Sequence, residues 1–281
     1  MIAAHNGPVL NCNGRTLDLS VPQVMGILNI TPDSFSDGGC FLSLSAAIDH
    51  ASRMIKEGAA IIDIGGESTR PGAEELTVQQ ELDRVLPVVE ALSSRFSVPL
   101  SVDTSKPEVM RESVAAGAGM INDVRALAAD GAIELIAKLG VPVCLMHMQG
   151  QPRTMQQQPR YENVVAEVCS FLKTRAETAI ENGIAAEMIV LDPGFGFGKT
   201  LEHNRHLLNS LATLTELGYP ILVGVSRKSM IGSLLGLPAD QRLYGSLAAA
   251  VIAVREGAKL VRAHDVRPTL EAITVAAAIA D

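Results

Sequence analysis

The stretch MIVLDPGFGFGKT, residues 188–200, consists of an apolar run, Asp192 and a glycine-rich turn. The run MIVL is short and rich in branched aliphatic residues, which is typical of a buried strand. The ending Gly-Lys-Thr raises the question of a phosphate-binding P-loop, which reads G-x-x-x-x-G-K-[ST]. The first glycine of that pattern would fall on Pro193, which has no N–H to donate to a phosphate. The stretch therefore predicts a strand followed by a functional turn of another kind.

The same unit, a short apolar run followed by a longer helical segment, recurs along the chain. Residues 44–57 and 78–95 have helical spacing, and glycines mark the ends of such segments at 58, 117, 140, 183, 218 and 257. The predicted strands are residues 23–30, 59–65, 99–103, 120–124, 142–148, 188–192, 220–226 and 259–264. Repeated βα units over ~250 residues predict a single-domain (β/α)₈ TIM barrel spanning residues 1–281. An open, doubly wound sheet is the alternative.

The N-terminal segment VLNCNGRTLDLS, residues 9–20, predicts a β-hairpin turning at Asn13-Gly14, a favoured two-residue turn. We expect this hairpin to cap the bottom of the barrel. The stretch before it, MIAAHNGPVL, has neither the basic nor the apolar region of a signal peptide. No apolar run approaches the ~20 residues that a membrane span needs. We therefore expect no membrane association.

Composition narrows the possible partners and the compartment. Apolar residues make up 47% of the chain, aromatic residues only 3%, and the formal net charge is −8. An acidic chain with few aromatic residues is poorly suited to nucleic acid. The four cysteines, at 12, 40, 144 and 169, do not form close pairs, which favours reduced thiols over a disulfide frame or a zinc site. These features predict a cytoplasmic enzyme.

Polar residues gather where the predicted strands end. In a βα barrel the loops after the strands converge on one face, which carries the active site. Asp103, Asn122 and Asp192 offer hydrogen-bond acceptors suited to a flat heterocycle with amino and ring N–H groups. Four groups are cationic or can become so by protonation, which suits a phosphate or pyrophosphate: Arg70, Lys228, Arg262 and His264. Further polar strand ends are Asn29, Asp63, His147 and Ser226.

Some of these residues also have purely structural interpretations. We expect His147, inside an apolar run, to be a hydrogen-bonded core histidine. Lys199 and Thr200 are expected to form a solvated helix start, and Arg227 a structural ion pair. Two roles stay open for Asp63: a contact with the ligand, or a hydrogen-bonding role inside the barrel.

Eight segments, taken together, resemble the bacterial dihydropteroate synthase family. The segments are GILNITPDSFSDGG (26–39), DIGGESTRPGA (63–73), SVDTSKPEV (101–109), INDV (121–124), MHMQGQPRTMQ (146–156), LDPGFGFGKT (191–200), GVSRKSMIG (224–232) and VRAHDV (261–266). The resemblance runs from about residue 9 to the C-terminus and implies a TIM barrel. It implies condensation of 6-hydroxymethyl-7,8-dihydropterin pyrophosphate with p-aminobenzoate, giving 7,8-dihydropteroate and pyrophosphate. It also implies that sulfonamides compete with p-aminobenzoate.

The resemblance also implies roles for individual residues. Asp192, Asp103 and Asn122 would bind the pterin, with Met146 packed on its face. Phe197 and Lys228 would border the aminobenzoate pocket, and Arg262 and His264 would hold the pyrophosphate, sharing Mg²⁺ with Asn29. The remaining implied substrate contacts are Phe35, Thr69, Pro71 and Ser226, and the implied catalytic residues are Arg70, Lys228, Arg262 and His264. The loops carrying Phe35 and 69–71 would close over the site.

Two other functions stay open from the sequence. A pterin-binding methyltransferase partner domain would keep the pterin acceptors but would not need the segments ESTRPGA and SRKS. A non-catalytic scaffold would not need Asn29, Arg262 or His264. Residues 243–254 and 270–280 carry more apolar residues than one core-facing stripe requires, and the family is commonly dimeric, so we expect a homodimer.

Overall fold

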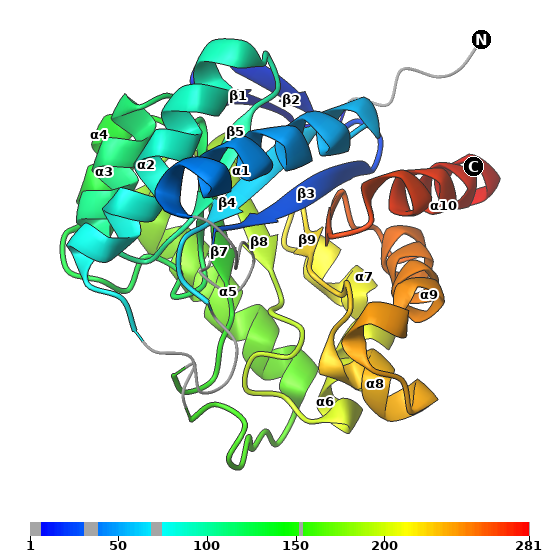
Figure 1. Ribbon diagram of the computed structural model, residues 1–281. Helices are drawn as coiled ribbons and strands as arrows, with labels where there is room; N and C mark the ends of the chain where they lie inside the picture. The colour runs from blue at the N-terminus through cyan, green and yellow to red at the C-terminus, as the bar shows by residue number, and fades with distance from the viewer. Residues whose placement is uncertain (1–6, 31–38, 69–74, 152–153, 281) are drawn as a thin grey trace, which may run out of the picture.

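The chain forms a closed barrel of parallel strands surrounded by helices (Figure 1). The computed structural model describes residues 7–30, 39–68, 75–151 and 154–280. The barrel strands are β3 (Gln23–Asn29), β4 (Ile61–Gly65), β5 (Leu100–Asp103), β6 (Met120–Asp123), β7 (Val143–Met146), β8 (Ile189–Asp192), β9 (Leu222–Val223) and β10 (Leu260–Ala263). They pair in chain order, with β10 beside β3, and a single bridge between Leu191 and Ile221 joins β8 to β9. The predicted TIM barrel is confirmed, and the open sheet is excluded.

The strands are buried on both faces because helices cover the outside of the barrel. The helices are α1 (Gly39–Lys56), α2 (Val78–Arg95), α3 (Pro107–Ala115), α4 (Ala132–Leu139), α5 (Val164–Glu181), α6 (Leu201–Asn209), α7 (Leu211–Thr215), α8 (Ser229–Leu235), α9 (Leu243–Arg255) and α10 (Val266–Ala280). Short 3₁₀ turns occur at Ala186–Met188 (η2) and Ala239–Gln241 (η3). In the described ranges, no helix combines the length and apolar character that crossing a membrane would require.

The N-terminal hairpin covers the end of the barrel at which the strands begin, which is the bottom of the barrel in the prediction. Strands β1 (Val9–Cys12) and β2 (Arg15–Asp18) pair antiparallel around Asn13 and Gly14, which both have positive φ. The side chains of Leu10, Cys12 and Leu17 are buried in one cluster with residues that begin the barrel strands. The packing is close, because a Cβ added at Gly119 would lie 2.3 Å from the Cys12 carbonyl oxygen. In the part of the chain that the structure describes, the hairpin therefore covers the end of the barrel at which the strands begin.

Several predicted element boundaries differ from the observed ones. The strand predicted at 220–226 pairs only over Ile221 and β9, because the chain leaves the ladder after Val223 and then turns, with the Lys228 N–H donating to the Val225 carbonyl. The helix predicted at 270–280 begins earlier, at Val266, since Pro268 lies in the first turn, where no backbone N–H is needed. Helix α1 likewise begins before the predicted residue 44. The glycines predicted as helix stops all have positive φ, at 58, 117, 140, 183, 218 and 257.

Candidate active site

Parallel pairing brings the polar strand ends to one level of the barrel. Asn29 pairs in register with Gly65, and Gly65 pairs with Asp103. Asp103 pairs in turn with Asn122. On the opposite wall, Met146 pairs with Asp192. Because these residues end their strands or lie near the ends, the rim predicted from the sequence exists in three dimensions.

A buried ion-pair network occupies the middle of this rim. The Arg262 Nε lies 2.6 Å from Asp63 Oδ2, and one terminal nitrogen lies 3.1 Å from Asp103 Oδ2. The Asn122 amide donates to Asp63 Oδ2 at 3.2 Å. Asp63 is fully buried, which confirms its barrel-interior role. Burial opposes the charge of Arg262, but Asp63 and Asp103 outweigh it and raise the arginine pKa.

A second cluster lies between β8 and the segment after β9. The Lys228 Nζ lies 4.1 Å from the centroid of the Phe197 ring, a cation–π contact. Burial lowers the pKa of Lys228 to about 8, although Asp192 opposes that change. Burial raises the pKa of Asp192 to about 6, against the Gly194 N–H and nearby cations. Both groups can therefore change protonation near neutral pH.

The segments after β9 and β10 are linked by Ser226 and His264. The Ser226 hydroxyl lies 3.0 Å from His264 Nδ1, and the His264 backbone N–H donates to the same hydroxyl at 3.2 Å. His264 stands two residues after Arg262, at the same end of the barrel. The structure therefore brings together three of the predicted phosphate-binding and catalytic residues, Lys228, Arg262 and His264.

An apolar wall lies next to these polar groups. Val124, Met146, Met155 and Phe197 form a separate buried cluster, with Met148 packed against it. Flexible methionines beside an aromatic ring make a surface that suits a flat aromatic ligand. The rim therefore offers acceptors, cations and an apolar face within one site.

The prediction for Lys199 is wrong. Its side chain is only 3% exposed, and its Nζ donates to the carbonyls of Gly194 and Phe197 at 2.9 and 3.1 Å. The prediction of a solvated side chain failed because Lys199 directly precedes a true helix N-cap, so its position in the sequence resembles a helix start. Thr200 caps α6 and forms a capping box with His203, as expected of a helix start.

His147 is the buried, hydrogen-bonded histidine that the sequence predicted. It is 6% exposed, and its Nδ1 lies 2.9 Å from the Lys199 Nζ. Burial, with Lys199 adding to it, lowers the pKa of His147 to about 3. The ring is therefore neutral, and Nδ1 accepts the hydrogen bond. The expected structural ion pair of Arg227 is also confirmed, since its guanidinium binds both oxygens of Asp265 at 3.0 and 2.7 Å.

The sequence interpretation missed an ion-pair cluster below the segment after β4. Lys106 donates to Glu67 and, at 2.6 Å, to Glu81, whose side chain is 1% exposed. Glu67 also accepts from the Leu76 N–H at 3.3 Å. Glu67 belongs to the motif ESTRPGA and Lys106 to SVDTSKPEV, but nothing in the spacing of the two motifs shows that these residues meet. Phe35, Thr69, Arg70 and Pro71 lie outside the described residues, so their predicted roles stay predictions.

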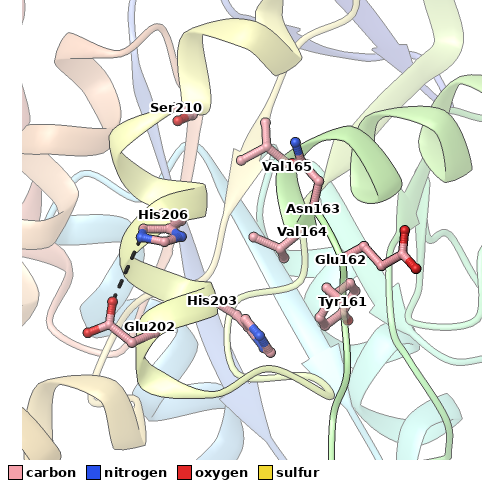
Figure 2. A pocket seen from close by; sticks show the side chains of 9 residues that line it. All are labelled: Tyr161, Glu162, Asn163, Val164, Val165, Glu202, His203, His206 and Ser210. Carbon is pink, nitrogen blue, oxygen red and sulfur yellow. Dashed lines mark ion pairs between the residues drawn. The ribbon is translucent and has the colours of Figure 1, made fainter.

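A hollow of about 600 Å³ lies away from the strand ends, between the start of α5 and α6. Figure 2 shows its lining, which includes Tyr161, His203, His206 and Glu202, with an ion pair of 3.8 Å between the last two. The Tyr161 hydroxyl donates to the Gly198 carbonyl at 2.9 Å. The hollow therefore contains none of the predicted site residues, and only its lining residue Tyr161 is bonded to the glycine-rich turn.

Mg²⁺ prefers oxygen ligands and keeps several waters, so a site for it needs only a few oxygen donors from the protein. Over the described ranges, no group of three or more His, Cys, Asp and Glu side chains could hold a metal. Asn29 offers one carboxamide oxygen at the rim, and Gly65 beside it carries no side chain that would fill the space. A single neutral oxygen fits a Mg²⁺ ion that takes its other ligands from a phosphate and water.

The fold and the rim define a pterin-binding enzyme on a TIM barrel. The pterin binding enzyme family matches residues 25–264. The chain is 58% identical to the dihydropteroate synthase of Escherichia coli K12, with 95% of this chain and 94% of that protein covered.

Two solved structures are similarly close. The Yersinia pestis dihydropteroate synthase with a sulfonamide drug has a TM-score of 0.92 and 56% identity, covering 96% of this chain and 98% of that one. The Xanthomonas albilineans enzyme with 4-aminobenzoic acid has a TM-score of 0.93 and 52% identity, covering 98% of both. The chain belongs to the dihydropteroate synthase family and is an enzyme of folate biosynthesis.

Proposed function

We propose that this chain condenses 6-hydroxymethyl-7,8-dihydropterin pyrophosphate with p-aminobenzoate, releasing pyrophosphate and 7,8-dihydropteroate, and that sulfonamides compete for the aminobenzoate subsite. One observation carries the proposal. Acceptors, cations and an apolar wall, each suited to one part of the two substrates, converge on a single barrel end. The solved relatives with a sulfonamide and with 4-aminobenzoic acid support the choice of the second substrate.

The acceptors would hold the pterin. Asp192 presents a buried carboxylate that can accept two parallel N–H bonds from an amino-pyrimidine edge. Asp103 and Asn122, on neighbouring strands, would bind the opposite part of the ring. Met146, which pairs with Asp192 in register, would pack on its face. The apolar ring of Phe197 would border the aminobenzoate.

The cations would stabilise the departing pyrophosphate. Arg262 and His264 would bind its oxygens, Ser226 would orient the His264 ring, and Lys228 would reach both subsites. Asn29 would hold a Mg²⁺ ion, whose charge would further offset that of the leaving group. The amine nitrogen of p-aminobenzoate forms the new bond to the pterin CH₂ carbon, the C–O bond to pyrophosphate breaks, and the nitrogen loses a proton. The chain's task is to hold the amine in line and to stabilise the leaving group.

The proposal is tested by mixing the protein with the pterin pyrophosphate, Mg²⁺ and p-aminobenzoate and measuring pyrophosphate. We expect release that depends on p-aminobenzoate. A methyltransferase partner domain or a scaffold would bind pterin but release nothing, so a folded protein without release would overturn the proposal.

The single domain over residues 1–281 is also proposed, supported by the single sheet to which all barrel strands belong.

We expect the affinity for pterin to fall on acidification. The folded-state pKa of Asp192 is raised to about 6, and only the carboxylate accepts two N–H bonds. The association constant should therefore fall about tenfold from pH 7 to pH 5, where most of the carboxyl is protonated. Calorimetric titration of a pterin ligand across this range measures the effect. Asp192→Asn lacks this carboxyl and should bind weakly at every pH, with only a residual pH dependence from Asp103, whose pKa burial raises to about 7. A flat profile in the unmodified protein would contradict the assignment.

A homodimer is proposed on the face of α9 and α10, which lie side by side (Figure 1). Large apolar side chains are exposed there, namely Tyr244, Ile252, Val275 and Ile279. Exposed apolar patches of this kind are typical of protein interfaces.

A cytoplasmic location also stays a proposal, supported by the free thiols of Cys12, Cys144 and Cys169.

Introducing a charge into that face should produce monomers. Val275 is 58% exposed, so Val275→Glu should cost the fold little while burying an unpaired carboxylate in the dimer. Light scattering at micromolar concentration should give the dimer mass for the unmodified protein and the monomer mass for the variant. Thr174→Glu, at an exposed position of α5, is the matched control and should remain dimeric. A monomeric unmodified protein would rule out the dimer.

A further inference from the structure

We propose that Lys199 is a positioning residue, whose buried amino group fastens the glycine-rich turn to the end of β7 and thereby holds Phe197 at the aminobenzoate subsite. The inference rests on the proposed function, because that function gives Phe197 its role. It assigns a task to the lysine of Gly-Lys-Thr, which does not bind phosphate in the proposed reaction.

The contacts of Lys199 all lead to one turn and the strand end beside it. Its Nζ donates to the carbonyls of Gly194 and Phe197 within the turn. Across from the turn, Nζ lies 2.9 Å from His147 Nδ1 and 3.4 Å from the His147 carbonyl. The N–H donors of Nζ thus face four acceptors on two segments that are far apart in sequence. The lysine is a cross-link between these segments.

The charge of this lysine has no direct carboxylate partner among the described residues. Asp192 is the carboxylate whose field acts on it, and Lys228 opposes that field, while burial lowers the pKa of Lys199 to about 7. His147 stays neutral beside it, since the pKa of that ring is lowered to about 3. An apolar side chain of the same length would avoid the desolvation cost of the amino group but would remove the donor of the Gly194 and Phe197 carbonyls. The specific gain from lysine is therefore the set of hydrogen bonds to the turn.

The turn lies so close to the chain after β7 that only glycine fits at two positions. Gly194 has φ of +68°, and a Cβ there would lie 1.9 Å from the His147 carbonyl oxygen. Gly198 has φ of +61°, and a Cβ there would lie 2.3 Å from the Gln149 carbonyl oxygen. Glycine also gives the turn high conformational freedom when nothing holds it. Lys199 supplies that restraint, together with the Tyr161 hydroxyl, which donates to the Gly198 carbonyl.

The restraint acts on Phe197 more than on Asp192. The Phe197 carbonyl is itself a Lys199 acceptor, and the ring stacks under Lys228 within the apolar wall. Asp192 belongs to strand β8, and the ladder to β7 fixes its backbone independently of the turn. Loss of the amino group should therefore disturb the aminobenzoate subsite and leave the pterin acceptor in place.

The experiment compares Lys199→Met with the unmodified enzyme and with Lys173→Met, a matched control at a lysine whose side chain is 62% exposed. Lys199→Met should raise the KM for p-aminobenzoate by on the order of tenfold and change the KM for the pterin pyrophosphate by less than about threefold. Hydrogen exchange should accelerate at the amides of residues 194–198 and stay unchanged in β7 and β8. Lys173→Met should alter neither readout.

Lys199→Gln, which keeps two N–H donors, should give intermediate values and serves if the methionine variant does not fold. Unchanged KM for p-aminobenzoate together with unchanged exchange in a folded variant would overturn the proposal. Equal increases in both KM values, or failure of both variants to fold, would also overturn it, because Lys199 would then serve the barrel as a whole. Hydrogen exchange needs no substrate, so an inactive unmodified protein would refute the proposed function and leave this measurement interpretable.

Discussion

Arg262→Met should destabilise the protein by about 3–5 kcal/mol and abolish measurable synthase activity. The guanidinium is the cation bound to both Asp63 and Asp103, and Asp63 is fully buried. Methionine fills part of the space but leaves two carboxylates without their counter-charge. The same change removes a group proposed to bind the departing pyrophosphate, whose loss alone should lower kcat by on the order of 10²–10³. Denaturant unfolding and the pyrophosphate assay measure the two effects separately.

The destabilisation of Arg262→Met should be smaller at pH 5 than at pH 8. Burial raises the pKa of Asp103, and Arg262 opposes that rise. In the Arg262→Met variant, Asp103 should therefore have a still higher folded-state pKa. A carboxyl with a raised folded-state pKa binds more protons in the native state, and the free energy of unfolding then increases as pH falls. Arg267→Met, at an exposed arginine paired with Glu271, should lose less than about 1 kcal/mol. Equal stability losses in the two variants would show that the buried network is not important for folding.

Much of the fold could be predicted because its determinants are local. Each barrel strand reads as a short aliphatic run, and a glycine with positive φ precedes most of the next runs. The closing contact between β8 and β9 could not be predicted, since it is one bridge between Leu191 and Ile221. The length of β9 was overestimated because residue pattern alone does not reveal where the ladder ends and the chain turns outward.

The predicted site was correct where strand register alone decides position. Asp103 and Asn122 end neighbouring strands, so their proximity follows from the parallel sheet. Lys199 was wrongly expected in solvent, because its acceptors include His147, which precedes it by 52 residues. The Lys106 contacts with Glu67 and Glu81 were missed for the same reason. Cross-links between loops depend on side-chain reach in three dimensions, which no single segment of sequence encodes.

Asp192→Asn should weaken pterin binding by roughly 2–4 kcal/mol, or about 30- to 1,000-fold in dissociation constant. The carboxylate offers acceptors at both oxygens, whereas the carboxamide places an N–H donor against an N–H of the ligand. That mismatch leaves a buried donor unsatisfied in addition to removing a charge-assisted bond. The fold should not suffer, because burial disfavours the Asp192 charge and the Asn oxygen can still accept from the Gly194 N–H, now 2.7 Å from the carboxylate.

Calorimetric titration with a pterin ligand distinguishes this local effect from a general one. Asp240→Asn makes the same chemical change at an exposed position and should leave the affinity unchanged. The melting temperature of Asp192→Asn should stay close to that of the unmodified protein, because relief of the buried Asp192 charge is offset by the loss of its attraction to Lys228 and Lys199. Unaltered pterin affinity in a folded Asp192→Asn protein would assign the pterin to other acceptors on the rim. The carboxylate of Asp192 would then serve mainly to hold the glycine-rich turn through Gly194.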